Sequence, residues 1–253
     1  MRSVSRRIYE PGSTPFGPLD IVRFDRRLPQ RAQALAMNYA GRTVQQAWLE
    51  SEWFARLEQP EAARAHKISV SHPSFMAGVM RTMQRALRGD GQESVWLAAH
   101  PGWGVSPVSL AQDSRNGSIN PLVGYAHAKH DVSGSRLEQR LKRTLYPSRV
   151  YAAVGDVAVQ TAWQRSGIGI AMSDAALSDF ADDKVPTTYV LGTHNSLTES
   201  LEQYGYQITG QQLRDDLVEG LQIPETRMQA DSVGAVRERM IRSHPWLQEV
   251  VEL

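Results

Sequence analysis

The sequence predicts an α/β protein with a mixed sheet, because strand-like runs alternate with helical stretches along the chain. The clearest unit lies between Val157 and Phe180, where a strand-like run leads through a glycine turn into a helical pattern. Apolar residues recur there every four positions and form one stripe of the expected helix, at Ile168, Met172, Ala176 and Phe180. Polar residues lie on its other side, at Asp174, Ser178 and Asp182.

Two glycines in this turn, Gly167 and Gly169, have two interpretations. They let the backbone come close to a pyrophosphate, and a helix start offers unpaired N–H groups and partial positive charge to such an anion. The alternative is that they only shape a strand-to-helix turn, because a bare G-x-G is a weak motif.

Composition sets broad limits. The 253 residues, 41% hydrophobic and 22% charged, suffice for one large domain or two small ones and are not typical of disorder. A net charge of +1 argues against nucleic acid as a partner held by overall charge. The lack of cysteine excludes disulfides and is compatible with a reducing cytoplasm. Because no signal peptide or membrane-spanning apolar run is evident, we expect a soluble cytoplasmic protein without a membrane partner.

Before the glycine turn, we expect strands mixed with helices. Residues 1–18 are predicted to form a polar arm, and Leu19–Phe24 alternates as a first strand. The stretch from Pro29 to Glu58 is predicted to be helical, and three of its aromatic residues either pack in the core or line a substrate pocket, namely Trp48, Trp53 and Phe54. Further elements are a helix at Ser74–Leu87 and strands at Ser94–Ala99 and Leu122–Ala128.

The residues of the glycine turn read Gln164-Arg165-Ser166-Gly167-Ile168-Gly169 and follow the strand-like run Val157–Val159. This segment resembles motif A of the GNAT superfamily of N-acetyltransferases, whose signature is Q/R-x-x-G-x-G/A after a strand. The next blocks also follow the family's order: a strand-like TTYVLGT, His194-Asn195, a helical SLTESLEQY and the pair Gly205-Tyr206. The resemblance covers about residues 150 to 210 and implies a GNAT-like acyl-CoA N-acyltransferase fold with extra helices.

This resemblance divides the chain into an arm (1–18), a GNAT-like domain (19–210) and a C-terminal helical extension (211–253) packed on that domain. Residues 133–147 are predicted to form a helical insert that departs from the family pattern. The extension is predicted to contain two helices, near Gln211–Leu221 and Ser232–Ser243. Its role, as an edge cover, a homodimer contact or a border of the acceptor site, stays open.

The resemblance implies transfer of an acetyl or related acyl group from acetyl-CoA to a primary amine, on a small molecule or peptide, by direct attack in a ternary complex. Backbone N–H groups of the turn would hold the coenzyme A pyrophosphate, from Gln164, Arg165, Ser166, Gly167, Ile168 and Gly169. The edge from Val157 to Val159 would pair with the pantetheine arm, and the N–H of Val159 would polarise the thioester carbonyl. Asn195 has the residue type of an asparagine that contacts the cofactor in the family. Its spacing to Gly205 is one residue shorter than in the family, so His194 is the alternative for that position.

Two residues are candidates for proton transfer. Asp156, next to the strand, is the expected base, although an aspartate after Gly155 also suits a turn. In the family a tyrosine often protonates the leaving thiolate, and its position corresponds to Leu201 here. Tyr204 is the nearest phenol that could take this role; alternatively, its side chain only packs. No metal site is predicted, because the seven histidines show no metal spacing and His127 and His130 are an isolated pair.

Two other functions remain open. A non-catalytic coenzyme A sensor or scaffold is favoured by the leucine at position 201. A protein or aminoacyl-RNA acceptor would use basic residues of the insert, although such a run is usually a solvated face: Arg136, Arg140, Lys142, Arg143 and Arg149. The sequence does not predict the acceptor, the acyl-chain preference or the oligomeric state.

Overall fold

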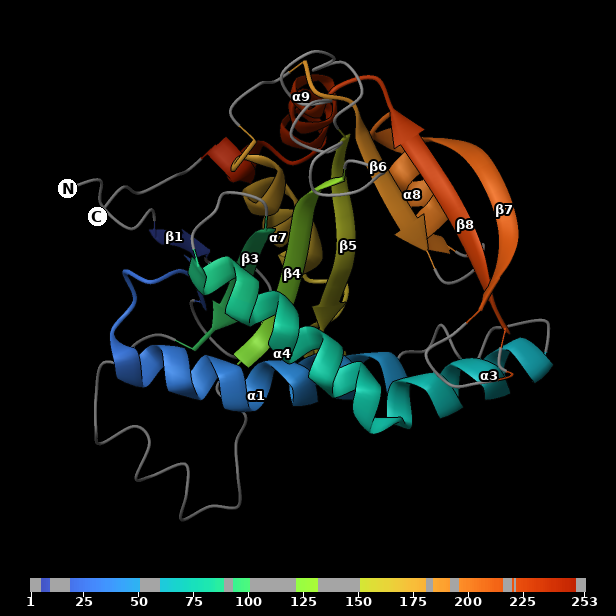
Figure 1. The fold of residues 1–253 in the computed structure, drawn as a ribbon. Coiled ribbons are helices and arrows are strands. Elements are labelled where there is room, and N and C mark those ends of the chain that lie inside the picture. The colour runs from blue at the N-terminus through green and yellow to red at the C-terminus, as the bar shows by residue number, and fades with distance from the viewer. Residues whose placement is uncertain are drawn as a thin grey trace.

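One mixed sheet with helices on both faces organises the protein (Figure 1). The computed structural model describes residues 6–9, 19–50, 60–88, 93–100, 122–131, 151–180, 184–191, 196–215, 220 and 222–248. The eight strands of these ranges follow the order β1-β2-β3-β4-β5-β6-β8-β7. Their bounds are Arg6–Tyr9 (β1), Leu19–Arg23 (β2), Glu93–Ala99 (β3), Leu122–Asp131 (β4), Tyr151–Val159 (β5), Thr187–Leu191 (β6), Gln207–Asp215 (β7) and Gln222–Ala230 (β8).

Strands β5 and β6 run parallel, whereas the other neighbours are antiparallel. A parallel pair requires a crossover connection. Here the crossover contains the short 3-10 turn η2 (Thr161–Trp163), the glycine turn and helix α7 (Ile168–Leu177). The expected order of strand, glycine turn and helix is therefore confirmed.

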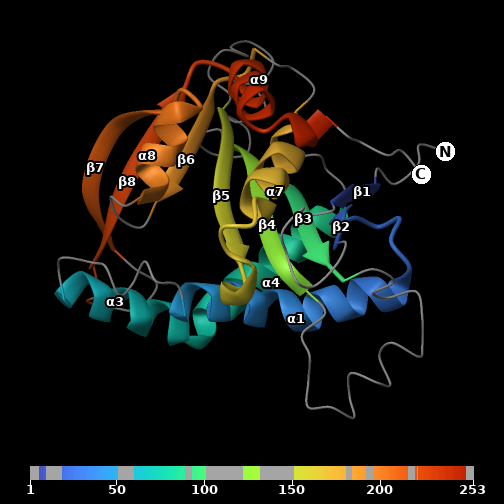
Figure 2. The ribbon, with the colours of Figure 1, turned by 180° about the vertical axis from the view of Figure 1, so that it is seen from behind.

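The helices form two layers (Figures 1 and 2). Helices α1 (Gln30–Leu49) and α4 (Pro73–Arg88) cover one side of the sheet, here called the α1/α4 face, and α3 (Pro60–Ser71) extends this layer toward β8. Helices α7, α8 (Ser196–Gln203) and α9 (Val233–Ser243) cover the other side, the α7 face, and α9 leads into the 3-10 turn η3 (Pro245–Gln248). Local sequence sets two helix starts: Pro73 is the first residue of α4, and Ser232 Oγ accepts the Ala235 N–H at 3.1 Å before α9.

Each face carries its own apolar core, because side chains alternate along the strands. On β3, Trp96 joins the core under α7, whereas Leu97 joins the core under α1 and α4. The predicted stripe of α7 is confirmed, since all four of its residues are at most 4% exposed. Asp174 of the expected polar side is nonetheless only 1% exposed, and it accepts a hydrogen bond from Arg237 Nε at 2.8 Å. The helix is thus buried on both sides, and its carboxylate is neutralised by α9.

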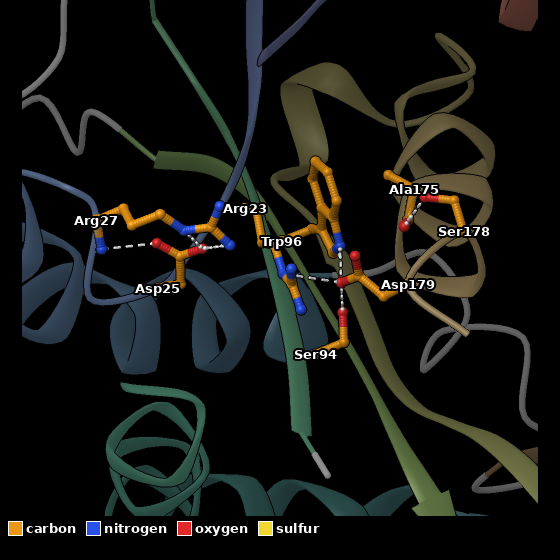
Figure 3. Close-up of polar contacts among 8 residues, drawn as sticks. All are labelled: Arg23, Asp25, Arg27, Ser94, Trp96, Ala175, Ser178 and Asp179. Carbon is orange, nitrogen blue, oxygen red and sulfur yellow. Dashed lines mark hydrogen bonds and ion pairs between the residues drawn. The ribbon is translucent and has the colours of Figure 1, made fainter. Parts of the chain in front are cut away.

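A second carboxylate fixes the end of α7 to the sheet (Figure 3). Asp179 Oδ2 accepts a hydrogen bond from Trp96 Nε1 at 2.9 Å and forms an ion pair with Arg23 Nε at 3.1 Å. Ser94 Oγ donates to the same oxygen. These contacts tie the C-terminal end of α7 to β2 and β3.

The C-terminal region differs from the prediction. The helix expected at Gln211–Leu221 is wrong: β7 includes residues 211–215, and it forms a hairpin with β8. Pro224 lies within β8 rather than in a turn between helices. It lies outside the segment Thr226–Ala230, which pairs with β6, so its missing N–H removes no hydrogen bond between β8 and β6. The second predicted helix is confirmed as α9, and part of the expected arm, Arg6–Tyr9, forms the edge strand β1.

Some expectations concern residues outside the described ranges. These are the aromatic pair Trp53 and Phe54, the insert 133–147 with its basic residues, and the pair His194-Asn195. Among the described helices, none has both the length and the apolar character needed to cross a bilayer.

Candidate active site

Strand β5 leaves its parallel neighbour halfway along its length. Pairing with β6 involves only Ala152, Ala153 and Val154. At this point the register between β4 and β5 shifts, because His127 is opposite Asp156 while Ala128 is opposite Val154, which leaves Gly155 as the extra residue of a β-bulge. Beyond the bulge, no described residue pairs with the β6 side of residues 155–159. We call Val154–Asp156 the apex of this splay.

The free edge of β5 presents backbone groups in a regular order. Gln160 donates its N–H to Val123 O of β4 at 2.8 Å. Since N–H directions alternate along a strand, the N–H groups of Val157 and Val159 point away from β4, toward the unpaired edge. This edge offers strand-like hydrogen bonds to an extended ligand.

The glycine turn follows directly and has an unusual backbone. Gln164 Nε2 donates to Val159 O at 3.0 Å, and Ser166 Oγ donates to Trp163 O at 2.5 Å. Arg165 has a φ of 63° and Gly167 a φ of 86°, so two residues of the turn are left-handed. Gly167 is the N-cap of α7 and provides no side-chain cap for the first helical N–H groups. A strained turn thus presents the positive end of α7 beside the free edge of β5.

These features occur in the order that the sequence resemblance requires: a splayed strand, the turn from Gln164 to Gly169, a helix, a parallel strand, a second helix and Gly205-Tyr206 before β7. The fold is that of the GNAT superfamily. The GNAT-like fold class predicted from the sequence is confirmed.

Solved structures with a similar fold include acetyltransferases. YncA from Salmonella typhimurium, a putative acetyltransferase solved with acetyl-CoA, has a TM-score of 0.47 and 13% identity, over 84% of this chain and 93% of that chain. Spermidine/spermine N-acetyltransferase SpeG from Vibrio cholerae has a TM-score of 0.44 and 10% identity, over 89% of this chain and 96% of that chain. The NatC complex, bound to a Gag peptide and CoA, has a TM-score of 0.42 and 13% identity, over 84% of this chain and 98% of that chain. TM-scores this low support no argument about this chain. The sequence matches no protein-family model and no curated protein sequence.

Gly169 of the GNAT turn is unusual because the protein itself does not require a glycine there. Its backbone is helical with no positive φ, unlike that of Gly167. A Cβ at this position would lie 3.7 Å from a Val159 methyl and 3.8 Å from a Val157 methyl, which are ordinary contacts. Glycine in a helix also costs stability relative to alanine. The missing side chain therefore keeps space open between the start of α7 and the free edge of β5.

Asp156 lies at the apex, on the α1/α4 face. It is half-buried and directly opposite His127 across the β4–β5 ladder. The structure therefore places one sequence-predicted catalytic residue, Asp156, next to the edge residue Val157, at the other end of the free edge from the glycine turn.

Tyr204 has a different environment. Its hydroxyl lies 2.9 Å from His244 Nε2, beyond the end of α9, and burial raises the pKa of the phenol. Helix α9 lies at the opposite end of the sheet from the turn between β5 and α7 (Figures 1 and 2). Leu201, at the family's tyrosine position, is 3% exposed within the core. The structure does not bring Tyr204 to the free edge, which favours the alternative that it packs against α9.

Sequence reasoning missed three residues beside the apex: Glu93, Tyr125 and His127. Tyr125 and His127 alternate on β4, so their shared face was readable once a strand at Leu122–Ala128 was predicted. Glu93 comes from β3, and only the register of that strand with β4 brings it close. Among the described residues, no group of three or more histidine, aspartate or glutamate side chains is arranged to hold a metal ion.

Proposed function

We propose that the protein is an acyl-CoA dependent N-acyltransferase that moves an acetyl group from acetyl-CoA to a primary amine by direct attack in a ternary complex. The observation that carries this proposal is Gly169, a glycine that neither backbone conformation nor packing explains, positioned between a helix start and a free strand edge. A diphosphate needs such a space, because its oxygens approach backbone N–H groups only where no side chain intervenes.

The residues of the turn would hold the pyrophosphate through their backbone N–H groups, from Gln164, Arg165, Ser166, Gly167, Ile168 and Gly169. The positive φ of Arg165, a strained conformation for a residue other than glycine, supports this role, since strained backbone often accompanies ligand binding. The free edge at Val157 and Val159 would hydrogen-bond the pantetheine arm as a neighbouring strand does.

The N–H of Val157 is the better candidate for polarising the thioester carbonyl. When bound, acyl-CoA supplies an activated acyl carbon at the far end of its pantetheine arm. Val159 adjoins the turn that would hold the phosphates, whereas Val157 is about 7 Å farther toward the apex at strand spacing. An N–H near the apex can stabilise charge on the carbonyl oxygen while Asp156 meets the amine on the α1/α4 face.

A titration calorimetry experiment tests this proposal. Acetyl-CoA and coenzyme A should both bind the unaltered protein, and Gly169→Ala should weaken both by at least about tenfold, because a methyl group would occupy the pyrophosphate space. Gly78→Ala is the matched control: Gly78 is in helix α4, and its added Cβ would meet only the end of Arg81 at 4.0 Å. Both variants should be as stable as the parent or more so, by up to about 1 kcal/mol. Equal binding by all three proteins would contradict the phosphate assignment.

A coenzyme A sensor without catalysis is the second candidate. It is favoured by the buried leucine at position 201 and by the contact between Tyr204 and His244, because neither position then supplies a phenol to the free edge. Release of free thiol distinguishes the two functions, because an enzyme releases coenzyme A in the presence of an amine, whereas a sensor only binds the cofactor.

A further inference from the structure

A polar cluster lies beside the apex under α1 and α4. Its members come from three adjacent strands: Glu93 of β3, Tyr125 and His127 of β4, and Asp156 of β5. Cross-strand partners share a face of a sheet, so His127 and Asp156 both face the α1/α4 layer. Tyr125, two residues before His127, lies on that face as well.

The imidazole of His127 has a defined orientation. Its Nε2 contacts Glu93 Oε2, while Glu93 Oε1 accepts a hydrogen bond from Arg85 Nε at 2.7 Å. Burial raises the pKa of Glu93, but the hydrogen bonds and charges of His127 and Arg85 outweigh it and hold the pKa below its ordinary value. Glu93 is therefore a carboxylate and accepts a hydrogen from Nε2, so that in the neutral tautomer of this ring the lone pair lies on Nδ1.

Nδ1 faces the bulge. A Cβ on Gly155 would lie 3.0 Å from it, so glycine at the apex is what allows the ring to approach. Within the described residues no group donates a hydrogen bond to Nδ1, although the His127 side chain is only 8% exposed. The charged groups facing the ring are Glu93 and Asp156, with Arg85 of α4 behind Glu93.

The hydroxyl of Tyr125 is a buried polar atom without a hydrogen-bond partner among the described residues. Burial raises the pKa of this phenol, and the charges of Asp156 and Glu93 raise it further, so it remains a donor. An unpartnered buried donor is costly and is usually explained by a water or a ligand. Beside the Asp156 carboxylate and the His127 ring, this hydroxyl marks a binding position for a small polar group.

We propose that this cluster receives the ammonium group of the acceptor, with Asp156 holding the cation and the Glu93–His127 pair taking its proton. The inference rests on the proposed function and assigns the base within it, so that the role first expected of Asp156 passes to His127 Nδ1. Glu93 stabilises the imidazolium that forms, as a carboxylate behind a histidine does in other proton transfers.

The proton balance is simple. The ammonium gives one proton to His127 Nδ1, and the freed nitrogen lone pair forms the C–N bond while the C–S bond breaks. The remaining proton that the nitrogen must lose ends on the departing thiolate, and the imidazolium returns its proton to water. The net change is one amide, one thiol and one released proton.

The first test needs no acceptor. Side-chain 15N NMR of the full-length protein at neutral pH should find His127 neutral and protonated on Nε2, with a bare Nδ1. Glu93→Ala should remove this preference and give a mixture of tautomers, because Nε2 then loses its acceptor. A proton on Nδ1 in the unaltered protein, or a doubly protonated ring, would overturn the proposal.

Kinetics with butylamine as a primary-amine probe provide the second test, followed as thiol release from acetyl-CoA. His127→Gln should bind acetyl-CoA as the parent does, yet release thiol about 100-fold more slowly. Asp156→Asn should raise KM for butylamine more than it lowers kcat. His72→Gln is the matched control, since His72 Nδ1 only accepts the Ser74 N–H at the start of α4. Normal thiol release by His127→Gln would refute this inference alone, whereas failure of the unaltered protein to bind acetyl-CoA would refute the proposed function.

Discussion

The buried tyrosines of the two sheet faces differ in one respect. On the α7 face, the hydroxyl of Tyr206 lies 3.1 Å from Thr187 Oγ1 and the hydroxyl of Tyr204 lies 2.9 Å from His244 Nε2. On the α1/α4 face, the hydroxyl of Tyr125 has no such partner among the described residues. A buried polar group with a partner contributes to stability, whereas one without a partner costs stability. The comparison indicates that the hydroxyls of Tyr204 and Tyr206 contribute to stability, whereas the hydroxyl of Tyr125 is available to the acceptor proposed above.

Removing the partner of a buried carboxylate on the α7 face should have the largest effect. Arg237→Ala leaves Asp174 charged at 1% exposure, which should lower the free energy of unfolding by about 3 kcal/mol. Arg242→Ala on the same helix is the control, because its partner Glu238 is exposed and such pairs contribute about 0.5 kcal/mol or less. Urea denaturation measures both, and equal losses would mean that burial of Asp174 does not matter.

Two tyrosine substitutions compare the faces directly. Tyr206→Phe should lower the free energy of unfolding by about 1 kcal/mol, because Thr187 loses a hydrogen-bond partner in the core. Tyr125→Phe should leave stability unchanged without ligand, since no described group loses a partner. A loss at Tyr125 as large as that at Tyr206 would indicate that its hydroxyl is already satisfied in the resting protein.

The smallest expected effect is a pH dependence from Glu93. Its pKa lies below the ordinary 4.5 in the folded protein, so its contribution to stability is present above that value and is lost as pH falls through the lowered pKa. Urea midpoints measured from about pH 6 to about pH 3 should therefore fall less steeply in Glu93→Gln than in the parent. Parallel curves for the two proteins would exclude a stabilising role for this carboxylate.

Local sequence patterns predicted the core of the fold and the glycine turn. The stripe of α7, the strand at Leu19–Phe24 and the run Val157–Val159 were all recognisable, because their signals lie within one element. The strand at residues 211–215 could not be recognised from the sequence. This edge strand exposes Gln211, Gln212 and Leu213 in succession, so it lacks the alternation of buried and exposed residues that indicates a strand.

Partners distant in the sequence account for the rest. Arg237 is 63 residues from Asp174, and Glu93 is 34 residues from His127, so neither contact has a local signal. The bulge at Gly155 likewise depends on register with β4. The sequence therefore predicted the glycine turn of the site, but not the part of the site that is formed by residues from adjacent strands.

Backbone amide hydrogen exchange with and without acetyl-CoA tests the central claim most directly. If the free edge and the glycine turn hold acyl-CoA, the amides of Val157, Val159 and Gly169 should exchange more slowly when the cofactor is present. Ala158 should change little, because its N–H already points toward β4. Unchanged exchange at all three amides, under conditions where acetyl-CoA is bound, would contradict the assignment of this edge as the acyl-CoA site.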